Sequence, residues 1–192
     1  MNTTLPQIWM VRHGETAWSL SGQHTGRTDI PLTEQGERDA RALQPRLAKH
    51  SFAKVLSSPS IRARRTGELA GFAGSMQIDE DLLEWDYGLY EGRTTAEIRA
   101  EHPGWNPYQH GCPGGENLGD IATRAERLIA SARAEQRDVL IFAHRDILRI
   151  VAARWIALPP LEARRLYLEP ASISVLSYDH TLEEPILRTL NT

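Results

Sequence analysis

Histidine and arginine side chains stand at the ends of three strand-like runs in this chain of 192 residues. Arg12 and His13 end the run IWMVRH, His144 ends DVLIFAH, and Arg62 follows AKVLSS within a helical turn. A lone histidine at a strand end is usually held by a backbone carbonyl, but the joint placement favours a shared site. Since ligands of open α/β sheets bind beyond the carboxyl ends of the strands, we expect these four side chains to converge at one edge of a sheet.

Two imidazoles and two guanidiniums together suit the transfer of a phosphoryl group. Guanidiniums bind the oxygens of a phosphoryl dianion and stabilise its charge in the transition state. One neutral imidazole can attack phosphorus while the other donates a hydrogen bond to the same group. Gly14, directly after His13, is expected to let the backbone approach the phosphate closely.

The leaving oxygen in such a transfer also needs a proton donor. A carboxylic acid beside a bound anion has a raised pKa, which this role requires. The stretch LEWDYGLYEG offers Glu84, Asp86 and Glu91. Sequence spacing does not choose among them.

Strand-like and helix-like segments alternate along the chain, and this alternation predicts a three-layer α/β/α sandwich. Short apolar runs rich in β-branched residues indicate the strands. The expected strands are 8–13, 53–58, 76–78, the apolar part of 138–146, 172–178 and 185–190.

Capping residues and apolar spacing indicate the helices. Thr33 is expected to cap a helix that Pro45 kinks or breaks. Ser58-Pro59 is expected to supply the cap and the first residue of a helix that runs to about Leu69. Two more helices are expected at 118–136, with an apolar face, and after His144 through Trp155.

Length and composition predict one globular domain spanning residues 1–192, with 41% hydrophobic and 24% charged residues. We expect a cytoplasmic protein, because neither a signal peptide nor a membrane segment is recognisable. The single cysteine, Cys112, excludes an internal disulfide and a cysteine-built metal site. A net charge of −3 argues against a broad nucleic-acid surface.

Five motifs in order resemble the histidine phosphatase, or phosphoglycerate mutase-like, superfamily. They are RHGET (12–16), HTGRTDIPLTEQG (24–36), SSPSIRARRT (57–66), LLEWDYGLYEG (82–92) and FAH (142–144). The resemblance spans nearly the whole chain and implies that His13 is the nucleophile that becomes phosphohistidine. It further implies that Arg12, Arg62 and His144 complete the phosphate pocket and that Glu84 is the acid/base.

The same resemblance implies further contacts and an architecture. Thr25 and Gly26 are expected to contact the substrate phosphate, and Ser19 and Tyr87 to line the pocket. No metal or organic cofactor is expected, the fold implied has a mostly parallel six-stranded sheet, and the partner is a small phosphorylated molecule. The oligomeric state stays open, with a homodimer as one alternative.

Departures from the mutase pattern favour a phosphatase. Mutases of the family carry a lysine and a paired arginine where this chain has Thr94-Thr95 and Gln109-His110. The stretch GWNPYQHGCPGGEN and the C-terminal SISVLSYDHTLEEPIL are more similar to the branch of broad-specificity acid phosphatases and sedoheptulose-bisphosphatases. We therefore expect hydrolysis of small phosphomonoesters such as sugar phosphates.

Three alternatives and one departure stay open at this point. The alternatives are a cofactor-dependent phosphoglycerate mutase, a catalytically inactive phospho-ligand binding protein, and a metallohydrolase built on His13, His144 and Asp86. The departure is Arg145, which stands where the family usually has glycine. Its guanidinium either borders the pocket and favours a substrate with a second anionic group, or turns to solvent and helps to start a helix.

Overall fold

A six-stranded sheet forms the centre of the protein in the computed structural model, which describes residues 5–192. The strand order is β3-β2-β4-β1-β5-β6, and β5 alone runs antiparallel to its neighbours. The strands are β1 (Ile8–Arg12), β2 (Lys54–Ser57), β3 (Met76–Ile78), β4 (Val139–Ala143), β5 (Ile173–Tyr178) and β6 (Pro185–Thr189). The predicted mostly parallel sheet and all six expected strands are confirmed.

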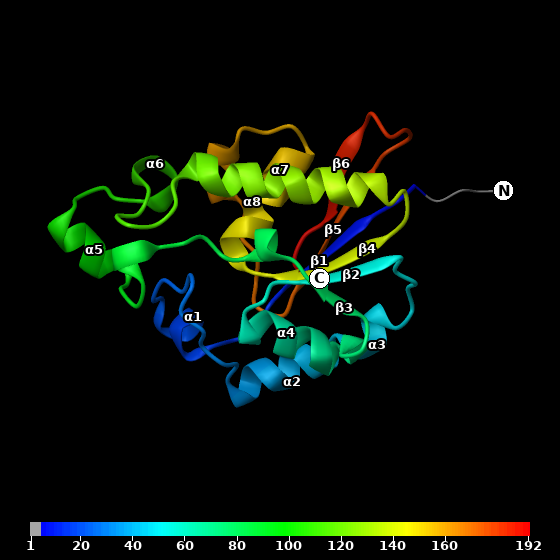
Figure 1. Ribbon diagram of the computed structural model, residues 1–192, viewed down its shortest axis with the longest axis horizontal. Coiled ribbons are helices and arrows are strands. Elements are labelled where there is room, and N and C mark those ends of the chain that lie inside the picture. The colour runs from blue at the N-terminus through cyan, green and yellow to red at the C-terminus, as the bar shows by residue number, and fades with distance from the viewer. Residues whose placement is uncertain (1–4) are drawn as a thin grey trace.

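Helices cover both faces of the sheet, so the predicted three layers are confirmed (Figure 1). One face carries α7 (Leu118–Ala134) and α8 (Arg145–Trp155), and the other carries α2 (Glu34–Ala42), α3 (Gln44–Leu47) and α4 (Ile61–Gly67). Successive strand residues enter opposite cores, as the two-residue period of a strand requires. Met10 and Ile141 pack on the α7/α8 side, whereas Val11 and Phe142 pack on the other.

Shorter elements gather at the end of the molecule away from the N-terminus (Figure 1). They are α1 (Ala17–Ser21), α5 (Thr95–Glu101) and α6 (Pro107–His110). The 3₁₀ helix η4 (Pro160–Arg165) packs against α8. Within residues 5–192, every helix falls short of the length or the apolarity that crossing a bilayer requires.

The helix termini agree with the sequence signals at three places and differ at one. Thr33 caps α2 by accepting from the Gly36 amide, Pro45 separates α2 from α3, and α8 ends at Trp155. The prediction that Ser58-Pro59 starts a helix is wrong. Helix α4 begins at Ile61 with Ser60 as its N-cap, and a π-helical segment, Glu68–Phe72, continues it.

Ser58 is unavailable as a cap because its backbone pairs with the neighbouring strand just beyond the end of β2. Its amide donates to the Phe142 carbonyl at 3.0 Å and so extends the pairing of β2 with β4. Its hydroxyl lies 2.8 Å from Nε2 of His144. Ser58 therefore lies at the same edge of the sheet as His144.

Candidate active site

His13 lies just beyond β1 with its imidazole in a single defined tautomer. Its amide donates to the Ala143 carbonyl, which pairs it with the end of β4. Its Nδ1 lies 2.7 Å from the carbonyl oxygen of Gly14. Since a carbonyl can only accept, Nδ1 carries the proton and Nε2 keeps a free lone pair. This is the tautomer that an attacking imidazole requires.

His144 follows β4 and has the opposite tautomer. Arg62, which has no acceptor atom, donates from Nε to Nδ1 of His144 at 3.1 Å. The proton of this imidazole therefore resides on Nε2, which donates to the Ser58 hydroxyl at 2.8 Å. The rings of His13 and His144 lie edge to face with centroids 5.2 Å apart.

Both imidazoles are neutral at physiological pH. Burial, followed by the nearby Arg62 and Arg12, holds the pKa of His13 well below its ordinary value. Burial and, to a smaller extent, the charge of Arg62 also lower the pKa of His144. Buried bases next to cations lose the proton more readily because the charged form is poorly solvated and repelled.

Glu84 is the carboxyl group that the fold brings to the histidines. Its oxygens accept from the amides of Trp85, Asp146 and Ile147 at 3.0–3.2 Å, so the carboxylate sits on the amino end of α8. Burial raises its pKa, and the neighbouring charge of Asp146 adds to that rise. A buried carboxyl with a raised pKa is suited to deliver a proton.

The two other acids of the same loop serve different purposes. Asp86 accepts from the Gly88 amide at 2.9 Å and pairs with Arg27 at 3.4 Å. Glu91 accepts from the amides of Arg27 and Thr28 and from the Thr28 hydroxyl, which fixes the preceding loop. Of the three carboxyl groups that the sequence left open, Glu84 is the one that lines the cavity beside His13.

Arg124 of α7 holds the loop that carries Glu84, and the sequence reading overlooked it. Its guanidinium donates to the carbonyls of Asp81, Leu83 and Glu84 and to both carboxylate oxygens of Glu116. A sequence signal for it exists. Arg124 falls on the apolar stripe of its helix, between the buried Ile121 and Ala125, and a charge in that position must be paired.

A cavity of about 60 Å³ opens beside His13 and has room for a phosphoryl group rather than a whole sugar ester. Of the residues predicted for the site, seven line it: Arg12, His13, Ser19, Thr25, Glu84, Tyr87 and Arg145. Arg62 and His144 lie directly behind them and are fully buried. Their assignment to the phosphate pocket stays a prediction.

Arg12 presents an unsatisfied donor in this cavity's wall. Its Nη1 donates to the Leu168 carbonyl at 2.6 Å, but its buried Nε has no partner among residues 5–192. Burial and the neighbouring Arg145 lower the pKa of Arg12 to about 10, so it stays charged at neutral pH. A buried cation with an open donor indicates a site for an anion.

Two glycines of the motifs have packing roles, and their expected proximity to the phosphate stays a prediction. A Cβ on Gly14 would lie 2.5 Å from the carbonyl oxygen of Gly36, so the glycine permits close contact with α2. A Cβ on Gly26 would lie 2.5 Å from the Trp85 carbonyl oxygen. The Gly26 carbonyl accepts from Arg62 at 2.9 Å, which ties the loop to α4.

Asp146 is the buried centre of a polar network that reaches Tyr87. One carboxylate oxygen accepts from Tyr108 and Arg149, both within 2.9 Å, and the other from Tyr87 and Arg145. This network joins the acid-bearing loop, α6 and α8. It also fixes the Tyr87 ring, which lies against His24 with centroids 4.5 Å apart.

Arg145 and His24 line both the first cavity and a second one of about 310 Å³. The Arg145 side chain is 36% exposed and lines both cavities. It therefore borders the pocket, which is one of the two positions that the sequence left open for this guanidinium. His24 is buried between the cavities, and burial together with Arg145 lowers its pKa to about 4. Arg99, Arg149 and Arg164 contribute further positive charge to the second cavity.

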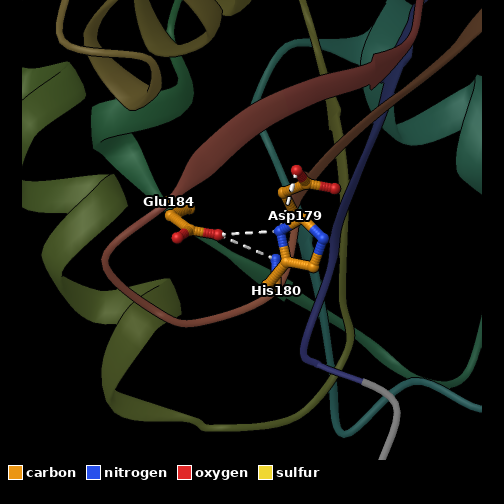
Figure 2. A group of neighbouring side chains, drawn as sticks. All are labelled: Asp179, His180 and Glu184. Carbon is orange, nitrogen blue, oxygen red and sulfur yellow. Dashed lines mark hydrogen bonds and ion pairs between the residues drawn. The ribbon is translucent and has the colours of Figure 1, made fainter.

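The three-ligand arrangement of a metallohydrolase is not assembled at the histidines, because Asp86 pairs with Arg27 and Gly88 instead. In the described part of the chain, the potential metal ligands that approach within 4.8 Å of one another are Asp179, His180 and Glu184, all exposed (Figure 2). The backbone and ring of His180 both bond Glu184, and the Asp179 amide donates to the Glu184 carbonyl. These contacts close the turn between β5 and β6.

The assembled groups can perform phosphoryl transfer. A neutral imidazole with a free Nε2, a buried carboxyl with a raised pKa and a buried guanidinium with an open donor share one cavity. Such groups are chemically suited to act as a nucleophile, a proton donor and an anion ligand.

Comparison with known proteins places the chain among proteins of similar chemistry. Residues 8–191 match the family described as the histidine phosphatase superfamily, branch 1. An acid phosphatase of Mycobacterium tuberculosis is 37% identical over 182 residues, which cover 93% of this chain and 89% of that protein. A sedoheptulose 1,7-bisphosphatase of Saccharomyces cerevisiae is 35% identical over 195 residues, covering 82% of this chain and 70% of that protein.

The fold agrees with the sequence comparison. A solved structure of an open reading frame product from Mycobacterium tuberculosis superposes with a TM-score of 0.91 and 37% identity. The match covers 97% of each chain.

Proposed function

The chain belongs to the histidine phosphatase superfamily and is a phosphatase, and we propose that it hydrolyses small phosphomonoesters through a phosphohistidine on His13. One observation carries the assignment of residues. The Nδ1–H of His13 is held by the Gly14 carbonyl, so its Nε2 lone pair is free in a cavity that also contains Glu84 and Arg12.

In the first step Nε2 of His13 attacks phosphorus and the bond between phosphorus and the ester oxygen breaks. Glu84 gives its proton to that oxygen, and the alcohol leaves. The Arg12 guanidinium, which lines the cavity, binds an oxygen of the phosphoryl group as its charge redistributes. Arg62 holds the loop of Gly26 and Thr28 and the imidazole of His144 in place.

In the second step the ionised Glu84 takes a proton from water and the water oxygen attacks the phosphohistidine. The nitrogen–phosphorus bond breaks, and orthophosphate leaves with His13 neutral and Glu84 protonated. The raised pKa of Glu84 favours this restored state. No metal ion enters either step, so we propose that a chelator leaves the activity intact.

The test is hydrolysis of 4-nitrophenyl phosphate by chelator-treated protein. His13→Ala should lower kcat by at least about 10³-fold because the covalent route is lost. A phosphoenzyme that is stable to alkali and labile to acid should form in the wild type and be absent from the variant. His102→Ala, which removes an exposed imidazole, is the matched control. Undiminished activity in His13→Ala would exclude the proposed nucleophile, and an inactive wild type would favour the binding-protein alternative.

A phosphoglycerate mutase is the second candidate, and the arginine-lined second cavity favours it, because that cavity can hold the distal carboxylate of a phosphoglycerate. The cations missing at Thr94-Thr95 and Gln109-His110 are thus supplied from other elements. Incubation of 3-phosphoglycerate with 2,3-bisphosphoglycerate separates the two functions. We expect release of orthophosphate, whereas rapid isomerisation without release would establish the mutase. A cytoplasmic location and a homodimeric state stay predictions.

A further inference from the structure

We propose that the second cavity binds a second anionic group of the substrate, so that the preferred substrates are phosphomonoesters that carry another phosphate or a carboxylate. This inference rests on the proposed function, because the reacting phosphoryl group is taken to lie beside His13. It adds a binding site formed by Arg99, Arg145 and Arg164.

The arginines that line the second cavity come from three elements that share no sequence motif. Arg99 comes from α5, Arg145 and Arg149 from α8, and Arg164 from η4. Polar groups of Thr95 and Asn106 also line it. With about 310 Å³ it is larger than the cavity beside His13 and has room for the distal part of a substrate.

Positive charge in this cavity is not balanced by the protein. The acid in its lining is Asp146, and each oxygen of that carboxylate already accepts two hydrogen bonds. Asp146 is 1% exposed and is therefore shielded from the cavity by its own donors. An excess of cations that lacks an internal partner attracts an anion from solution.

Three of the arginines keep donors for such an anion. Arg149 is fully used, since it bonds the carbonyls of Ala163 and Arg164 and the carboxylate of Asp146. By contrast, the side chain of Arg164 is exposed and makes no hydrogen bond or ion pair within the described residues. Arg99 commits Nε to the Trp105 carbonyl, and Arg145 commits Nη2 to Asp146, so each guanidinium keeps at least one terminal nitrogen without a partner within residues 5–192.

Arg145 makes the two cavities one extended site. It lines both of them, and it stands at the amino end of α8 beside the amides that bind Glu84. A substrate whose phosphoryl group lies at His13 therefore meets Arg145 before its distal group reaches Arg99 and Arg164. One anionic group in each cavity satisfies donors that a monoanionic ester leaves open.

The test compares substrate pairs that differ in the second anionic group alone. Fructose 1,6-bisphosphate against fructose 6-phosphate probes a phosphate, and 3-phosphoglycerate against glycerol 3-phosphate probes a carboxylate. For each protein the readout is the ratio of kcat/KM within a pair, so the simpler ester is the internal reference. The wild type should prefer the doubly anionic member of at least one pair, and which pair responds identifies the distal group.

Arg164→Gln should lower that ratio about fivefold to tenfold, the effect of one partly exposed charge-assisted hydrogen bond. Arg164→Lys should retain part of the preference for the doubly anionic substrate. The double variant that combines Arg164→Gln with Arg99→Gln should lose more of that preference than Arg164→Gln alone. Arg165→Gln is the matched control, because Arg165 lies next in η4, is exposed and pairs with Glu162 outside the cavity. Ratios that are equal in all these variants, or an equal loss with Arg165→Gln, would refute the second site.

A binding measurement separates this inference from the proposed catalytic function. In the His13→Asn background, calorimetry should show that the bisphosphate binds more tightly than the monophosphate and that Arg164→Gln removes the difference. If wild-type protein hydrolyses no ester but this difference is present, the catalytic proposal fails and the second site stands. If hydrolysis depends on His13 but binding is indifferent to Arg164, the second site fails and the catalytic proposal stands.

Discussion

Replacing His13 by asparagine should make the protein less sensitive to acid. The folded chain keeps this imidazole neutral, since burial and two arginines hold its pKa well below the ordinary value. In the unfolded chain a histidine takes up a proton below about pH 6.5. The unfolded state then binds the extra proton, so the free energy of unfolding falls as the pH falls through this range.

The size of this effect follows from the two protonation equilibria. Between pH 7 and pH 5, a histidine that ionises only when unfolded lowers the free energy of unfolding by about 2 kcal/mol. His13→Asn removes that contribution. The difference between the free energies of unfolding at pH 7 and pH 5 should therefore shrink by about 2 kcal/mol. Glu84, whose pKa moves in the opposite direction, is present in both proteins and cancels.

Urea unfolding of both proteins at pH 5, 6 and 7 measures this difference, and equal m-values verify that the same surface is exposed on unfolding. His24→Asn is a parallel case, because burial lowers the pKa of His24 to about 4 and the same reduction is expected. If His24→Asn shows the reduction and His13→Asn does not, His13 is charged in the folded enzyme. The argument for a neutral nucleophile would then be wrong.

Two further substitutions test the acid and the buried network. Glu84→Gln should reduce kcat for alkyl phosphates by about 10²–10⁴-fold. It should reduce kcat for 4-nitrophenyl phosphate far less, because nitrophenolate leaves without a proton. Equal losses for both esters would contradict the role of Glu84 as proton donor. In the wild type, kcat/KM for alkyl esters should decline as the pH rises through the raised pKa of Glu84 and this group loses its proton. Asp146→Asn should lower the free energy of unfolding by about 3–5 kcal/mol, since it removes the charge that two arginines and two tyrosines share. Urea denaturation measures this loss against the exposed control Asp179→Asn, and a cost as small as that of the control would contradict the network.

The sequence predicts the architecture and the catalytic edge because these depend on local signals. Apolar runs that end in Arg12-His13 and His144 specify both the strands and their point of exit, and parallel pairing of β1 with β4 brings the ends together. The same pairing explains the failure at Ser58. Its amide completes a hydrogen bond to β4, and that tertiary contact outweighs the local capping signal of Ser-Pro.

Features that depend on distant contacts were not predictable. The second cavity combines Arg99, Arg145 and Arg164 from separate elements, and in sequence these arginines are indistinguishable from solvated ones. The choice of Glu84 over Asp86 depends on which carboxyl group meets the amino end of α8. Neither the spacing of the residues nor the composition predicts that contact.

The position of β1 in the sheet has a consequence for synthesis of the protein. Both neighbours of this strand lie in the C-terminal part of the chain, since β1 pairs with β4 and β5. While the ribosome is still making residues 20–138, the apolar strand that carries His13 has neither partner. Chains grow from the N-terminus, and contacts between distant segments form late. In the nascent polypeptide this strand therefore stays unpaired until β4 and β5 have been made, and His13 acquires its surroundings only then.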